Sequence, residues 1–198
     1  HILDLRKSLP LIENALKFAY ESSKNKKKFL FVSTKKQHSE IVENIAKETN
    51  NYFVNFRWLG GMITNWNTVK NSINTLNNYD NILNTEDTVF TKKELSDIEK
   101  KKIRLDKTLG GIVEMKSTPD VIFIIDTNRE HIAVLEAKKL GIPIIGIVDT
   151  NCDPDLIDYP IPANDDGVKS VQFILDNFKK VLVSSEDTSS AESTTKNE

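Results

Sequence analysis

Short apolar runs alternate with amphipathic stretches along most of this sequence. The runs are typical of strands buried on both faces of a sheet, and they lie at residues 29–33, 52–55, 121–125 and 144–148. Elsewhere apolar residues recur every three or four positions, which predicts helices at residues 9–20, 39–48, 129–140 and 165–181. This alternation indicates an α/β fold whose parallel sheet carries helices on both faces.

Residues 64–112 depart from this alternation, because they contain no strand-like run. Their apolar residues form one narrow seam before a polar break at residues 84–87 and a second seam after it. The seams consist of Trp66, Val69, Ile73, Leu76 and Leu83, then Leu95, Ile98, Leu105, Leu109 and Ile112. Two highly charged helices with such seams favour an antiparallel coiled-coil hairpin over two ordinary core helices. We therefore predict a helical hairpin inserted in the α/β domain.

Paired glycines bracket the predicted hairpin, and a tryptophan lies on either side of the first pair. Because glycine permits sharp turns and close backbone packing, we interpret these positions as a structural hinge at the base of the hairpin. The hinge residues are Trp58, Gly60, Gly61, Trp66, Gly110 and Gly111. The predicted division of the chain is an α/β domain from residues 1–63 and 113–183, a hairpin at residues 64–112, and a disordered acidic tail at residues 184–198.

Charge is distributed unevenly along the 198 residues. The net charge is −2, but residues 1–116 carry +6, residues 117–183 carry −5, and residues 184–198 carry −3. A basic half of this kind can meet the phosphates of a nucleic acid while the acidic half faces elsewhere. The apolar runs are far shorter than the roughly 20 residues that span a bilayer, which excludes a membrane-embedded protein.

The single cysteine, Cys152, excludes an internal disulfide and a multi-cysteine zinc site. The sequence begins at His1 rather than Met, so we expect further residues to precede it.

Basic clusters lie within the first half of the chain, with Trp58 and Trp66 interleaved. Lysine binds phosphate as a point charge with little sequence preference, so these clusters suit contact with a nucleic-acid backbone. The candidate RNA-binding residues are Lys26, Lys27, Lys28, Lys35, Lys36, Arg57, Lys92, Lys93, Lys100, Lys101, Lys102 and Arg104.

Acidic residues follow the predicted strands and leave an enzyme as the alternative. Ligands of open parallel sheets bind beyond the carboxyl ends of the strands, and carboxylates there could hold Mg²⁺. A Mg-dependent or sugar-phosphate enzyme would use Asp126, Asp149, Asp153 and Asp155. The sequence has neither a glycine-rich phosphate loop nor a Gly-x-Ser-x-Gly motif. We therefore favour helix caps and turns around Pro154, Pro160 and Pro162, with no catalytic residue, metal or cofactor.

The segment Val54-Asn-Phe-Arg-Trp-Leu-Gly-Gly-Met-Ile-Thr-Asn-Trp66 is the most specific pattern in the chain. It resembles the Val-Asn-x-Arg-Trp-Leu-Gly-Gly-x-x-Thr-Asn-Trp signature of the small-subunit ribosomal protein S-two family. Further similar blocks follow in the family's order, at residues 91–94, 109–112, 119–120, 130–133 with 136–137, 140–143, 148–155 and 161–166.

The resemblance implies a flavodoxin-like α/β domain with an inserted coiled-coil hairpin. It also implies a structural constituent of the small ribosomal subunit that binds small-subunit rRNA and neighbouring ribosomal proteins. No catalysis, nucleotide, small-molecule substrate or membrane is expected for such a protein.

Two details of the resemblance concern lineage. Residues 162–166 read Pro-Ala-Asn-Asp-Asp, with Ala163 in place of the glycine in the Pro-Gly-Asn-Asp-Asp block that most bacterial members resemble. The alanine form, together with the Asn-Cys-Asp-Pro block, looks like that of cyanobacterial and plastid members. Abundant Lys, Asn and Ile are typical of AT-rich organelle genomes. We therefore predict a plastid (chloroplast) ribosome, with a mitochondrial or bacterial cytoplasmic ribosome as the alternative.

Overall fold

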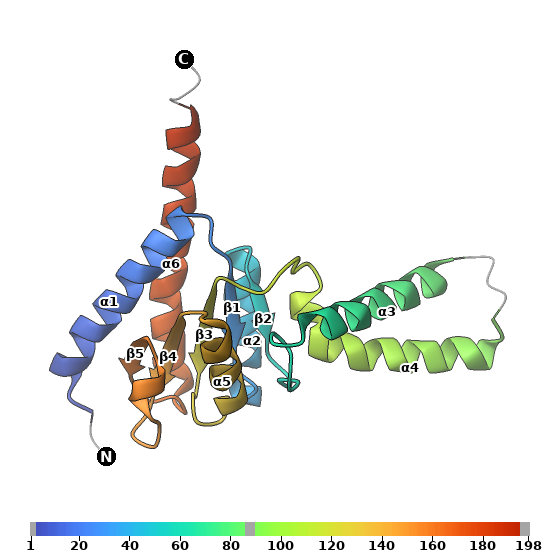
Figure 1. The fold of residues 1–198 in the computed structure, drawn as a ribbon, viewed down its shortest axis with the longest axis horizontal. Coiled ribbons are helices and arrows are strands. Elements are labelled where there is room, and N and C mark those ends of the chain that lie inside the picture. The colour runs from blue at the N-terminus through green and yellow to red at the C-terminus, as the bar shows by residue number, and fades with distance from the viewer. Residues whose placement is uncertain (1–2, 86–89, 195–198) are drawn as a thin grey trace.

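The computed structural model of the chain describes residues 3–85 and 90–194 (Figure 1). Its strands are β1 (Phe29–Val32), β2 (Tyr52–Val54), β3 (Val121–Ile125), β4 (Ile144–Val148) and β5 (Tyr159–Pro162). Its α-helices are α1 (Leu5–Lys24), α2 (Ser39–Glu48), α3 (Trp66–Asn84), α4 (Lys92–Leu109), α5 (His131–Leu140) and α6 (Val168–Thr194). Short 3₁₀ helices are η1 (Lys36–His38), η2 (Gly110–Ile112) and η3 (Pro154–Leu156). Of the helices in these described ranges, none is long and apolar enough to cross a membrane.

All strands belong to one parallel sheet in the order β2-β1-β3-β4-β5. This is the flavodoxin-like order, in which the chain moves outward from β1 to β2 and then returns to the other side of β1 at β3. The carboxyl ends of β1 and β3 therefore flank the point where the strand order reverses. The predicted fold class, an α/β protein with a flavodoxin-like parallel sheet, is confirmed.

The pleat of the strands divides the interior into two hydrophobic cores. On one face of the sheet, Leu30, Ile122 and Ile144 pack with residues of α5 and of the feet of α3 and α4. On the other face, side chains of α1, α2 and α6 cover the sheet, and the ring of Phe123 meets Phe178 edge-on at 4.9 Å between centroids. Because both faces are covered, β1, β3 and β4 are buried along their whole length.

The fifth strand, β5, was not expected from the sequence pattern. The prediction of turns around Pro160 and Pro162 is wrong, because both residues pair in parallel register with β4. Proline lacks a backbone N–H, but β5 lies at the edge of the sheet, where one side of the strand has no neighbour to bond. Ile161, between the two prolines, is fully buried and fixes the strand to the core.

The last helix, α6, also differs from expectation, since it continues to Thr194 whereas residues 184–198 were predicted to be disordered. Ser185 is fully buried, and its hydroxyl donates to Ser23 Oγ of α1 at 2.6 Å. Composition predicts no structure for a Ser/Thr-rich segment, but here the segment continues a helix that is already packed. Residues 195–198 lie outside the described residues.

Two antiparallel helices, α3 and α4, occupy the connection between β2 and β3, as the two apolar seams predict. They lie side by side and project away from the sheet (Figure 1). Their feet reach the core through buried Val69, Ile73 and Leu109. Part of the predicted polar break, residues 86 and 87, lies outside the described residues.

Each glycine pair at the feet of this hairpin contains one position that requires glycine. Gly61 has a φ of +84°, a left-handed conformation that other residues rarely adopt. A Cβ added to Gly111 would lie 2.1 Å from the carbonyl oxygen of Phe53, so the backbone of η2 touches β2 too closely for a side chain. Gly60 meets nothing within 4 Å, and Gly110 would meet Asp106 Oδ1 at 3.0 Å.

We expect Gly111→Ala to destabilise the protein by about 3 kcal/mol, because the added methyl group must displace the backbone of β2. Denaturant unfolding followed by circular dichroism measures this change. Gly60→Ala is the matched control and should change the free energy of unfolding by less than about 0.5 kcal/mol. Equal effects of the two substitutions would contradict the close approach of η2 and β2.

Candidate nucleic-acid interface

The basic residues expected to bind RNA lie at several separate places on the fold. They occupy the α1–β1 turn, the end of β1, the end of β2 and the length of α4. Among the described residues, the exposed ones whose side chains have no hydrogen-bond or ion-pair partner are Lys26, Lys27, Lys36, Arg57, Lys92, Lys93, Lys101 and Arg104. These side chains are available to an external phosphate.

Other predicted RNA-binding residues have partners inside the protein. Lys28 donates its ammonium to the carbonyl oxygen of Asn50 at 2.6 Å. Lys102 of α4 pairs with Asp80 of α3, across the hairpin. Lys100 approaches Asp97 at 3.6 Å on the exposed surface of α4, where an ion pair contributes little stability. The structure therefore gives Lys28 and Lys102 contacts within the fold that the sequence did not indicate.

Lys35 differs most from its expected role, because its ammonium lies among three carboxylates. Its Nζ is 2.6 Å from Asp126, 2.9 Å from Asp165 and 2.8 Å from Asp166. Its side chain is only 16% exposed. These contacts join the ends of β1 and β3 to the segment before α6, so Lys35 offsets protein carboxylates rather than facing solvent.

Burial and the shared ammonium together shift the pKa values of Lys35, Asp165 and Asp166. Burial alone would lower the pKa of Lys35, but its bonds to the aspartates raise that pKa above its usual range. Burial raises the pKa of Asp165, and the bond from Lys35 only partly opposes this effect. The exposed Asp166 has a lowered pKa because Lys35 bonds to its charged form.

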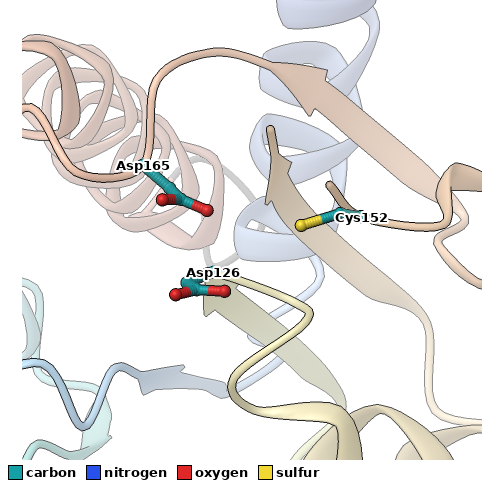
Figure 2. Close-up of side chains that lie close together, drawn as sticks. All are labelled: Asp126, Cys152 and Asp165. Carbon is teal, nitrogen blue, oxygen red and sulfur yellow. The ribbon is translucent and has the colours of Figure 1, made fainter. Parts of the chain in front are cut away.

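Figure 2 shows that Cys152 lies beside two carboxylates of this cluster, Asp126 and Asp165. One potential ligand atom of each lies within 4.8 Å of the others. The ammonium of Lys35 already bonds to both Asp126 and Asp165, so a divalent cation would have to displace it.

The structure does not assemble the site that the enzyme alternative requires. In the described ranges, Asp149, Asp153 and Asp155 do not join Asp126 in a group of potential metal ligands. Asp153 caps η3 by accepting from the N–H of Asp155 at 3.0 Å, which is the capping role expected for such residues.

The segment between β2 and α3 is held by Glu136 of α5, for which no role was predicted from the sequence. Its Oε1 accepts from the indole N–H of Trp58 at 3.1 Å and from the N–H of Gly61 at 2.7 Å. Its Oε2 accepts from the N–H of Ile63 and from both the N–H and the hydroxyl of Thr64, at 3.0 to 3.1 Å. One buried carboxylate thus satisfies five donors of the loop that leads into the hairpin.

The charge of Glu136 is stabilised by these donors. Burial would raise its pKa, but the bonds from Thr64, Trp58, Gly61 and Ile63 outweigh that effect and hold the pKa below its usual value. Two sequence signals could have indicated this role: Glu136 is a polar residue on the buried face of a predicted helix, and it lies in one of the blocks that resemble the family.

The two tryptophans of the predicted hinge, Trp58 and Trp66, lie at the base of the hairpin. Trp58 is 8% exposed and packs in the core beneath α5. Trp66 begins α3 and packs against the same core, although its indole N–H has no hydrogen-bond partner among the described residues.

Comparison with known proteins identifies close relatives of this chain. Residues 1–185 match the family model described as ribosomal protein S2. The chain is 55% identical over 172 residues to small ribosomal subunit protein uS2 of Wolbachia pipientis subsp. Culex pipiens, covering 87% of this chain and 64% of the relative. It is 49% identical over 183 residues to the protein of that name from Mesorhizobium japonicum, covering 92% of this chain and 70% of the relative. The chain therefore spans less than two thirds of the Wolbachia protein.

We expect Glu136→Gln to destabilise the protein by about 2–4 kcal/mol, because the amide would direct N–H groups at donors that need an acceptor. The stability that depends on Glu136 is fully present above its unfolded pKa of 4.5 and is lost as pH falls through the lower folded pKa. The variant should therefore lose less stability than the wild type on acidification. Denaturant unfolding at several pH values measures both effects.

Glu114→Gln provides the control, since Glu114 is exposed and should change stability by less than about 0.5 kcal/mol. A Glu136→Gln variant as stable as this control would show that the carboxylate is not needed to hold the loop.

Proposed function

Because the chain belongs to the ribosomal protein S2 family, we propose that it is a structural constituent of the small ribosomal subunit. In this role it binds small-subunit rRNA and neighbouring ribosomal proteins during translation and catalyses no reaction. The observation that carries the proposal is the match to the family over residues 1–185, which includes the sheet, the hairpin and the Glu136-bound loop.

The proposed RNA contacts are the exposed basic residues without internal partners. Lys92, Lys93, Lys101 and Arg104 lie along α4, which projects from the sheet and can reach an RNA surface that the body does not touch (Figure 1). Lys26, Lys27, Lys36 and Arg57 lie on the body. Lys28, Lys100 and Lys102 contribute positive potential while they remain bonded within the protein, whereas the charge of Lys35 is offset by its three aspartates.

We further propose that α3 and α4 form an antiparallel coiled coil that acts as a unit distinct from the α/β domain. Narrow seams and a cross-hairpin pair between Lys102 and Asp80 support this division at residues 64–112. The α/β domain then consists of residues 1–63 and 113–183, and α6 continues from this domain into residues 184–194.

The proposed location is a ribosome of bacterial type. The similar proteins named above are bacterial, from Wolbachia and Mesorhizobium. The plastid lineage inferred from Ala163 stays a prediction, beside a mitochondrial or bacterial cytoplasmic ribosome.

We expect the protein to sediment with small ribosomal subunits at moderate salt and to be released as salt increases, because phosphate contacts release counterions. The logarithm of the bound-to-free ratio should fall linearly with the logarithm of the salt concentration. In the double variant Lys101→Gln and Arg104→Gln, this line should become less steep, with the magnitude of its slope smaller by about 1 for each lost phosphate contact.

The matched control is Lys139→Gln with Lys169→Gln, which removes two exposed charges from α5 and α6 and should leave the slope unchanged. Recovery of the wild-type protein only in the soluble fraction, at every salt concentration, would refute the proposed function.

A further inference from the structure

A hollow of about 450 Å³ lies between the end of β2 and the start of α5. Its walls include Phe56, Arg57 and Trp58 from the Glu136-bound side and Arg129, Glu130 and Ile132 from the other. A volume of this size falls within the range of pockets for small ligands, roughly 300–1,000 Å³. The hollow is distinct from the lysine positions on α4 and from the carboxylate cluster around Lys35.

Arginine is rare in this protein, and two of its four arginines line this hollow. The sequence has 23 lysines and only four arginines, of which Arg57 and Arg129 lie here. The planar guanidinium of arginine can bond a phosphate with two parallel N–H groups and can stack on a ring, which the lysine ammonium cannot do. Two arginines at one place therefore suit a ligand that combines a flat ring with a phosphate.

Arg129 is fixed in position while part of its guanidinium stays free. Its Nε donates to the hydroxyl oxygen of Thr34 at 2.9 Å. The terminal nitrogens have no partner among the described residues, and the side chain is 53% exposed. Arg57 is exposed and likewise has no partner in the described ranges. Both arginines can therefore donate to a ligand without breaking a bond within the protein.

The carboxylate in the wall does not repel an anion, because its charge is already offset. Glu130 is 3% exposed, and its Oε1 accepts from the N–H of Thr34 at 2.8 Å and from the Thr34 hydroxyl at 2.6 Å. Arg129 lies 3.9 Å from the same oxygen. The exposed charge at the hollow is consequently positive.

Apolar side chains supply a surface for a ring. Phe56 is 57% exposed and Ile132 is 43% exposed, although both are large hydrophobic residues. The indole of Trp58 is buried and bonded to Glu136 of α5. Phe56 lies only two residues before Trp58, so the backbone of Phe56 is held close to α5. An exposed aromatic ring in the same hollow as two arginines matches the way in which proteins bind unpaired nucleotides.

We propose that this hollow binds one unpaired nucleotide of the RNA, with the base against Phe56 and Ile132 and the phosphate bonded by Arg57 and Arg129. The inference rests on the proposed function and specifies the kind of RNA feature that the body recognises. A duplex keeps its bases stacked inside, so it cannot use this surface.

The test compares the binding of a short single-stranded RNA and of an RNA duplex to the full chain by fluorescence anisotropy. Phe56→Leu, which keeps apolar volume but removes the ring, should weaken single-strand binding about tenfold and leave duplex binding unchanged. Arg57→Lys with Arg129→Lys keeps the charge but loses the planar groups, and should also weaken single-strand binding selectively.

The matched controls are Phe173→Leu on α6, whose ring is 69% exposed, and Arg6→Lys on α1. Neither should alter binding to either RNA. Thermal unfolding of each variant verifies that the fold is intact.

The possible outcomes separate this inference from the proposed function. If the wild-type protein binds single-stranded RNA and Phe56→Leu binds it equally well, the proposed nucleotide site is wrong, while the ribosomal role still stands. If the variants bind both RNAs normally but no longer sediment with small subunits, the proposed nucleotide site is wrong and the hollow is a surface that docks a protein. A wild-type protein that binds neither RNA would count against the proposed function itself.

Discussion

The buried carboxylate of Glu136 determines how the two parts of this fold are joined. Between β2 and α3 the chain leaves the sheet without forming a helix, so several backbone N–H groups have no partner in regular secondary structure. Glu136 bonds three of these groups together with the Trp58 indole and the Thr64 hydroxyl, and so offsets the cost of burying them. Because α5 lies on the sheet, this interaction fixes the foot of the hairpin to the body. It also holds the residues that follow β2, and with them Phe56 and Arg57, close to α5.

A second consequence of the fold is that lysine residues close in sequence have different roles. Lys35 and Lys36 are adjacent, yet the first lies among three aspartates and the second is exposed. Buried charges of this kind require partners, and Lys35 stabilises the ends of the strands where a flavodoxin-like fold gathers its polar residues. The exposed lysines are free to act on phosphates, which places the proposed RNA contacts on α4 and on the loops of the body.

The sequence predicted the elements whose signal is local. The apolar runs at β3 and β4 and the seams of α3 and α4 depend only on neighbouring residues, and each lies close to its predicted bounds. It missed β5, because two prolines indicate a turn unless the strand is known to lie at an edge. Lys35 and Glu136 could not be interpreted correctly either, because their partners lie about 70 to 130 residues away and only the fold brings them together. The sequence predicted a hinge that includes Gly61 and Gly111. The reason why each position needs glycine, a positive φ at Gly61 and the close approach of Gly111 to β2, is visible only in the structure.

Amide hydrogen exchange at Gly61, Ile63 and Thr64 tests the central claim that Glu136 holds this loop as part of the core. If the carboxylate bonds these N–H groups as the structure shows, they should exchange as slowly as the amides of β1 and β3, through global unfolding alone. Exchange of the three amides at the rate of an open surface loop, while the sheet stays protected, would contradict the account.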